Sequence, residues 1–127
     1  SKNPVFYVQY AHARICRVLE KLGDEGITCR NLPAAELKYS EEAELALIRQ
    51  IASLPETINE AASEYNPSKI TRYVLELAQL FHKFYDTCKI KGESEEIVQS
   101  RLSLCLAVKT VIKNMLDLLK VEAPEKM

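Results

Sequence analysis

The sequence predicts an all-α fold, a bundle of about five helices, and three observations support this prediction. Apolar residues recur at helical spacing through most of the chain, most clearly between residues 70 and 88. The pairs Asn3-Pro4 and Asn66-Pro67 are typical helix starts, because Asn caps free backbone N–H groups and Pro suits the first turn. A chain of 127 residues, 47% of them hydrophobic, can bury one sizeable core. We therefore expect residues 1–127 to form a single helical domain.

The first expected helix begins at Asn3-Pro4, ends near Gly23 and has two chemically different faces. At about 100° per residue, one face is apolar and holds Val8, Ala11, Ile15, Val18, Leu19 and Leu22. The other face is aromatic and basic and holds Tyr7, Tyr10, Arg14, Arg17 and Lys21. Such a stripe suits single-stranded or loop RNA, since rings stack on bases while cations meet phosphates. Spacing alone favours a plainer interpretation, in which the tyrosines cover the rim of the core and the cations are solvated.

A link and two short helices are expected in the middle of the chain. Residues 27–38 form an irregular link. Ser40, followed by acidic residues, predicts a helix start, because Ser caps backbone N–H groups and carboxylates favour the positive end of the helix dipole. The apolar stripe of this helix is expected at Leu45, Ile48 and Ala52. Leu54-Pro55 separates it from the next helix, which covers about residues 56–65.

Two long helices are expected in the second half. The first follows Asn66-Pro67, and its inward face holds Ile70, Val74, Leu77, Phe81, Phe84 and Cys88. A second aromatic and basic edge flanks this face and consists of Ala78, His82, Tyr85 and Lys89. After a turn at Lys91-Gly92, Ser94 caps a last helix that ends near Leu119. Its inward positions are Ile97, Leu104, Val108, Val111, Ile112, Met115 and Leu119.

Arg101 falls among the apolar positions of the last helix, where a buried guanidinium needs a partner. We expect it to reach the solvent edge or to pair with a carboxylate such as Asp86 or Glu76. The alternative is a direct contact with RNA. The first interpretation gives Arg101 a structural role and the second a role in binding.

Charge is nearly balanced overall but unevenly distributed. The formal net charge is −1, which argues against indiscriminate nucleic-acid binding by a large basic surface. Between residues 36 and 64 the sequence has two basic residues, Lys38 and Arg49, and seven glutamates. The glutamates are Glu36, Glu41, Glu42, Glu44, Glu56, Glu60 and Glu64. This segment is expected to be a solvated face that repels phosphate.

Motifs for catalysis and metal binding are missing from the sequence. The cysteines lack Cys-x-x-Cys spacing and are interpreted as buried free thiols: Cys16, Cys29, Cys88 and Cys105. His12 and His82 are isolated and are interpreted as ordinary helix residues. We expect no catalytic residue, metal site or cofactor in this chain. With no initiating Met and no long apolar stretch, it is expected to be a cytoplasmic fragment whose missing part lies upstream.

The run NPVFYVQYAHARI at residues 3–15 closely resembles the start of the DALR domain, the all-helical anticodon-binding domain at the C-terminal end of arginyl-tRNA synthetases. The resemblance continues in order through PSKITRYV at 67–74, LAQLFHKFYDTC at 77–88, RLSL at 101–104 and APEKM at 123–127. It spans essentially the whole chain. Several ordered matches at the family's spacing are specific, whereas one alone would be weak.

The resemblance implies that Tyr7, Tyr10, Tyr85 and Met127 surround the bases of the anticodon loop. In the family the terminal methionine ends the chain, so its carboxylate is free to accept a hydrogen bond. Every arginine anticodon has C in the middle, and cytosine presents an amino donor to such an acceptor. We expect Met127 to read this base while the three tyrosines hold the loop.

Phosphate contacts are expected, from geometry alone, at Arg14, Arg17, Lys21, Lys83 and Lys89. The chain departs from the family at Lys126, where Arg is common, and Cys16-Arg17 stands at a variable place. The tyrosines are therefore weighted above any single basic residue.

The resemblance also implies a parent enzyme, an arginine–tRNA ligase that uses ATP and Mg²⁺. The chain lacks the short ATP-binding sequences of class I synthetases, so it is expected to be a non-catalytic part of that enzyme. The expected partners are the anticodon loop of arginine tRNA and the catalytic domain of the same polypeptide, with no membrane. A monomer with weak affinity for RNA on its own is expected. Two alternatives stay open, a helical protein-interaction module and the related anticodon-binding domain of the glycyl-tRNA synthetase β subunit, although the first and last matching segments favour arginine.

Overall fold

The computed structural model describes residues 3–127, and this part of the chain is entirely helical apart from turns and links. The helices are α1 (Pro4–Asp24), the 3-10 helix η1 (Ala34–Glu36), α2 (Glu42–Ala52), α3 (Leu54–Ser63), α4 (Ser68–Thr87) and α5 (Glu95–Leu118). The predicted all-α class with about five helices is confirmed. No helix within residues 3–127 combines the length and apolarity that a membrane crossing requires.

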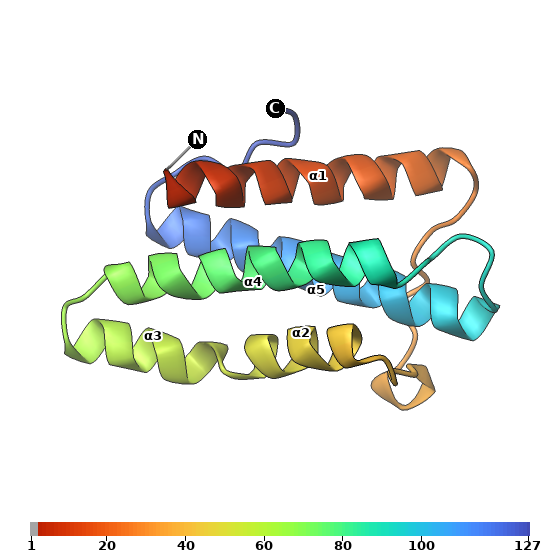
Figure 1. Ribbon diagram of the computed structural model, residues 1–127, viewed down its shortest axis with the longest axis horizontal. Coiled ribbons are helices and arrows are strands. Elements are labelled where there is room, and N and C mark those ends of the chain that lie inside the picture. Colours follow the sequence, from red (N-terminus) through yellow and green to blue (C-terminus); the bar gives the residue numbers. More distant parts are fainter. Residues whose placement is uncertain (1–2) are drawn as a thin grey trace.

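Helix α4 is the centre of the bundle and packs against α1, α2, α3 and α5. Figure 1 shows α1 on one side of α4 and the consecutive helices α2 and α3 on the other, with α5 behind. Helices α1 and α4 run in the same direction, and α5 runs back against both. The C-terminal residues return along α1, which brings the end of the chain to the outer side of the α1–α4 pair.

The hydrophobic core contains the apolar faces expected for the long helices. All six inward residues predicted for α4 are buried: Ile70, Val74, Leu77, Phe81, Phe84 and Cys88. On α1, Val8, Ala11, Ile15 and Leu22 are buried, while Val18 and Leu19 pack against the core. Since these faces turn inward, Tyr7, Tyr10 and Arg17 on α1 are exposed. On α4, His82 and Tyr85 are half-buried, whereas Ala78 of the expected edge is buried.

Most of the residues expected to cap or end the helices do so in the structure. Asn3 Oδ1 accepts from the Val5 N–H at 2.9 Å, and Ser94 Oγ accepts from Ile97 N–H. Gly26 has φ of 81° just after α1, a left-handed conformation that suits glycine. Ser40 does not cap α2, because Glu41 precedes that helix and Ser40 instead donates its backbone N–H to Glu44.

The apolar stripe expected for α2 is wrong in part, because Ile48 packs against the core, Leu45 is half-buried and Ala52 is exposed. The helix turns Leu47 and Glu44 into the core. Glu44 is buried because it pairs with a cation, since its Oε2 lies 2.9 Å from Arg101 Nε on α5. Glu44 Oε1 also accepts backbone N–H bonds from Ser40 at 3.0 Å and Glu41 at 2.9 Å. Glu44 is therefore an exception to the solvated acidic face.

Arg101 is a buried structural residue, and Glu44 is its partner in place of the expected Asp86 or Glu76. Its Nη1 donates to the Lys89 carbonyl oxygen, so the guanidinium joins α5 to the start of α2 and to the link after α4. Asp86 is exposed and pairs with Arg14. Since Arg101 is buried, it does not belong to a surface that could bind RNA.

The cysteines are free but differ in burial. Cys88 and Cys105 are buried, whereas Cys16 and Cys29 are half-buried, so the prediction of four buried thiols is wrong for two of them. Burial raises the pKa of the Cys105 thiol to about 12, which keeps it protonated and unreactive.

Candidate nucleic-acid interface

Tyr85 lies at the junction of two open pockets between α1 and the C-terminal half of α4. Its ring stacks on the buried Phe81, with 6.0 Å between ring centroids and 13° between planes, so the core fixes its position. The larger pocket has a volume of about 730 Å³ and is lined by Arg14, Arg17, Val18, Glu20, Lys21, Asp24, Tyr85, Lys126 and Met127. Tyr85 and Met127, far apart in the sequence, therefore face one space.

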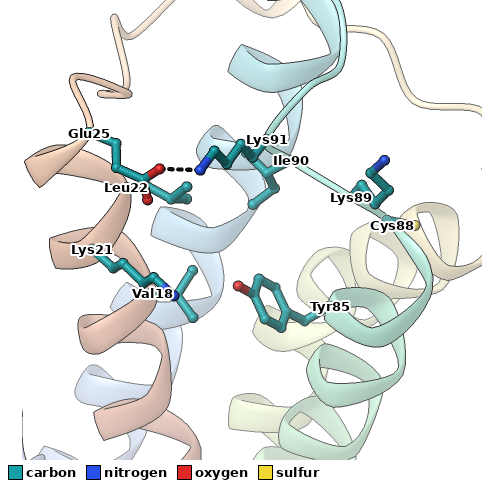
Figure 2. A pocket seen from close by; sticks show the side chains of 9 residues that line it. All are labelled: Val18, Lys21, Leu22, Glu25, Tyr85, Cys88, Lys89, Ile90 and Lys91. Carbon is teal, nitrogen blue, oxygen red and sulfur yellow. Dashed lines mark hydrogen bonds and ion pairs between the residues drawn. The ribbon is translucent and has the colours of Figure 1, made fainter.

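The smaller pocket has a volume of about 430 Å³ and shares Val18, Lys21 and Tyr85 with the larger one. Figure 2 shows the Tyr85 ring extending from α4 toward the side chains of Val18 and Lys21 on α1. An ion pair between Lys91 and Glu25 closes the far end, and the Lys91 ammonium holds the pKa of the Glu25 carboxyl below its usual value. The Lys89 ammonium points away from Tyr85.

Arg14 connects the two helices beside Tyr85. Its guanidinium carbon lies 5.1 Å from the centroid of the Tyr85 ring, within the range of a cation–π interaction. Arg14 Nη1 lies 2.7 Å from His82 Nδ1 and Nη2 lies 3.5 Å from Asp86 Oδ1. These contacts hold the cation at the rim of the larger pocket.

His82 is a site residue that sequence reasoning missed. Because the Arg14 guanidinium can only donate, His82 Nδ1 accepts the bond between them. Burial lowers the pKa of His82, the neighbouring Arg14 charge lowers it further, and Asp86 opposes both. The imidazole also meets the Tyr7 ring edge-on, with 5.4 Å between centroids. Its place on the edge that contains Tyr85 was the available signal, since His82 stands one turn earlier on the same side of the helix.

Tyr7 and Tyr10 are exposed on α1 and stand outside the lining of the larger pocket. Tyr7 is joined to the pocket through His82 and Arg14. The guanidinium carbon of Arg17, which lines the pocket, lies 5.7 Å from the Tyr10 ring centroid. The expected gathering of three tyrosines and Met127 is therefore direct for Tyr85 and Met127 and indirect for the other two rings.

Positive charge is concentrated around the pockets. The larger pocket combines four cations, Arg14, Arg17, Lys21 and Lys126, with the carboxylates of Glu20 and Asp24. Lys89 lines the smaller pocket together with Lys21 and Lys91, whereas Lys83 is exposed on the outer side of α4. Within residues 3–127, no group of three or more His, Cys, Asp or Glu residues could hold a metal ion.

The tail, residues 121–127, has no helix but is not free. Gln9 Nε2 donates to the Glu122 carbonyl oxygen at 3.0 Å, and His12 Nδ1 lies 2.8 Å from the Pro124 carbonyl oxygen. His12 is buried, in contrast to the ordinary helix residue that was expected. These two bonds attach the tail to α1 just before Met127, which lines the larger pocket.

The fold is an all-helical bundle in which Tyr85, Met127 and several cations line one surface pocket. Helical anticodon-binding domains are a class of protein with this combination of features. The family model described as DALR anticodon binding domain matches residues 8–127. The chain belongs to this family, and the resemblance found in the sequence is confirmed.

Similar proteins are arginine–tRNA ligases. The chain is 49% identical over 128 residues to that of Caldanaerobacter subterraneus subsp. tengcongensis and 44% identical to that of Ruminiclostridium cellulolyticum, covering all of this chain and 23% of each relative. The structure of Thermus thermophilus arginyl-tRNA synthetase matches 95% of this chain and 21% of its own, with 31% identity and a TM-score of 0.81. Plasmodium falciparum arginyl-tRNA synthetase matches 96% of this chain and 21% of its own, with 27% identity and a TM-score of 0.83. The chain thus spans less than a quarter of the length of these relatives.

Proposed function

We propose that this chain binds the anticodon loop of arginine tRNA and is the anticodon-binding domain of an arginine–tRNA ligase. The observation that carries the proposal is that Tyr85 and Met127 line one basic pocket between α1 and α4. Membership of the anticodon-binding family and similarity to arginine–tRNA ligases support it. The same similarity favours arginine over the glycyl-tRNA synthetase β subunit as the source of this domain.

The middle base of the anticodon enters the larger pocket. Cytosine offers an amino group as a donor, and a backbone oxygen at Met127 is suited to accept from it. Tyr85, held by its stack on Phe81, forms a rigid wall for this base. The exposed rings of Tyr7 and Tyr10 stack on neighbouring bases that leave the loop.

Phosphates of the loop meet Arg14, Arg17 and Lys21 at the pocket rim. Lys89 belongs to this set only through the smaller pocket, because its ammonium points away from Tyr85. With a formal net charge of −1, the domain gains little from long-range attraction. We expect a monomer in solution with a Kd above about 1 μM at physiological salt, since few phosphates are neutralised.

The parent ligase supplies the chemistry elsewhere. ATP and Mg²⁺ bind in the larger part of such an enzyme, since this chain matches less than a quarter of the length of the relatives. This domain contributes by orienting the tRNA against the catalytic domain of the same polypeptide. Binding energy gained at the anticodon thereby serves a reaction at a distant site.

A protein-interaction module is a second candidate with one observation in its favour. An apolar groove of about 430 Å³ lies between the α3–α4 turn and the end of α5, beside the exposed Leu118 and Tyr65. The remaining part of a ligase is a suitable occupant, since relatives carry more than three quarters of their length outside the matched region. Docking at this groove is compatible with RNA binding at the opposite end of the bundle.

The test is a fluorescence titration of the chain with an arginine anticodon stem-loop and with a stem-loop of unrelated sequence. We expect saturable binding to the first and at least tenfold weaker binding to the second. A pure interaction module would bind neither, and that result would overturn the proposal. Changing Leu118→Glu is the matched control, because it lies in the groove and leaves the α1–α4 pockets unaltered.

A further inference from the structure

His12 is a buried polar residue in the middle of α1, with 2% of its surface exposed. Its Nδ1 lies 2.8 Å from the carbonyl oxygen of Pro124. A carbonyl oxygen can only accept, so the imidazole donates from Nδ1. Nε2 is buried and has no hydrogen-bond partner among the described residues. The bond to Pro124 is therefore the polar contact that this side chain makes with the tail.

We propose that His12 is a positioning residue that fastens the C-terminal tail to α1 and thereby places Met127 in the larger pocket. The consequence for RNA binding rests on the proposed function, whereas the fastening itself does not. Neither His12 nor the tail was expected to have this role from the sequence.

Chain geometry connects the fastening point to Met127. Met127 lies three positions after Pro124, and a fully extended chain advances about 3.3–3.6 Å per residue. Met127 must therefore stay within about 10 Å of the Pro124 anchor. The tail has no helix to hold it, so release of the anchor would let Met127 leave the pocket.

The two hydrogen bonds that hold the tail, from His12 to Pro124 and from Gln9 to Glu122, differ in their burial. The bond from Gln9 to Glu122 is exposed and competes with water. The bond from His12 is partly buried, and its loss would leave the Pro124 carbonyl without this donor. A partly buried carbonyl left without its donor costs more than the loss of an exposed bond. We therefore expect His12 to contribute more than Gln9 to the docking of the tail.

Cys16 reports on the docked tail. It stands one turn after His12, and its Sγ lies 3.8 Å from His12 Nδ1. Burial raises the pKa of the Cys16 thiol, Lys109 lowers it, and the Glu125 carboxylate on the tail raises it. Since Cys16 contacts the same His12 Nδ1 to which Pro124 is bonded, we expect departure of the tail to remove Glu125 and to expose the thiol. Both effects increase its reaction rate with an uncharged thiol reagent.

The experiment measures that rate in a chain with Cys29→Ser, in which Cys88 and Cys105 are buried and Cys16 is the remaining half-buried thiol. His12→Asn and His12→Leu are a matched pair, because the two side chains have similar size and shape but only Asn offers a donor near the Nδ1 position. Removal of residues 122–127 gives the rate for a chain without the tail. Circular dichroism and thermal melting verify the fold of each variant.

We expect His12→Leu to raise the Cys16 rate about three- to tenfold, toward the rate of the tail-deleted chain, as befits loss of one hydrogen bond. His12→Asn should stay within about twofold of the parent chain. Equal rates for His12→Leu and the parent would overturn the fastening. Should His12→Leu fail to fold, an unchanged rate in the tail-deleted chain would overturn it, because the tail would then not cover Cys16.

RNA binding gives a separate readout. His12→Leu should weaken binding of the arginine stem-loop by no more than tail deletion does and should have no further effect in the tail-deleted chain. An additional loss there would contradict a role through the tail. If the parent chain binds no stem-loop, the proposed function fails, and the thiol rates still decide whether His12 fastens the tail.

Discussion

The guanidinium of Arg14 lies over the Tyr85 ring, 5.1 Å from its centroid, and joins α1 to α4 beside the larger pocket. The ring is held from the core by Phe81, and the cation is held by His82 and Asp86. Ring and charge are thus placed before any ligand arrives. Such preorganisation lowers the entropic cost of binding a flexible loop.

Replacing Tyr85→Ala should weaken binding of the arginine stem-loop by about 1–3 kcal/mol, the usual contribution of one stacked base. Tyr85→Phe retains the ring and should remain within about threefold of the parent chain. Isothermal titration measures both. Since Tyr85 packs on the core, thermal melts must show that Tyr85→Ala is folded at the titration temperature. Unchanged affinity in folded Tyr85→Ala would remove this ring from the site.

Replacing Arg14→Gln and Arg17→Gln together should flatten the dependence of log affinity on log salt. Each lost phosphate contact on a single strand reduces the slope by about 0.7. Titrations at several salt concentrations measure the slope. Arg49→Gln is the control, because this exposed residue on α2 pairs with Glu42 away from the pockets and should leave the slope unaltered. An unchanged slope in the double variant would exclude phosphate contacts at both arginines.

Replacing Glu44→Gln should lower the free energy of unfolding by about 3–5 kcal/mol, because it leaves the buried Arg101 guanidinium without its counter-charge. Urea denaturation measures the change. Glu42→Gln breaks an exposed ion pair on the same helix and should cost no more than about 1 kcal/mol. Similar stabilities for the two variants would contradict a buried role for the Arg101–Glu44 pair.

The same pair predicts a loss of stability in acid. Burial raises the pKa of Glu44, but hydrogen bonds from Arg101 and from the Glu41 and Ser40 backbone outweigh burial and lower it below the usual 4.5. The unfolded chain therefore binds this proton more readily than the folded chain. The stabilisation is complete above the unfolded pKa and disappears as pH falls through the folded one. Glu44→Gln should abolish this component of the acid dependence, and persistence of the full dependence would contradict it.

His82 should make the free energy of unfolding depend on pH in a higher pH range than Glu44 does. Its pKa is lowered in the folded state, so below about 6.5 the unfolded chain takes up the proton first. Stability should fall as pH drops below about 6.5, and the Arg14 bond should be lost when Nδ1 is protonated. His82→Asn keeps an acceptor for Arg14 and does not titrate. A parent chain and a His82→Asn variant with parallel stability curves would contradict this coupling.

The long helices could be predicted from the sequence because their apolar spacing is sustained over several turns, as on α4. The inward face of the short α2 was predicted only in part, because Glu44 is buried against Arg101, a partner far along the chain. Tail docking could not be foreseen for a similar reason, since His12 and Pro124 approach only when the bundle closes. The pocket at Tyr85 and Met127 is likewise a product of packing. Helical spacing placed Tyr85 on an aromatic and basic edge, whereas Met127 came from the resemblance to the family alone.

Discrimination of the middle anticodon base tests the central claim most directly. An arginine anticodon stem-loop, with C at the middle position, and the same stem-loop with G at that position are each titrated into the parent chain and into Tyr85→Ala. We expect the parent chain to bind the C stem-loop at least about tenfold more tightly, in line with 1–3 kcal/mol for base-specific hydrogen bonds, and Tyr85→Ala to lose most of this preference. Equal affinity of the parent chain for the two stem-loops would contradict a base-reading pocket at Tyr85 and Met127.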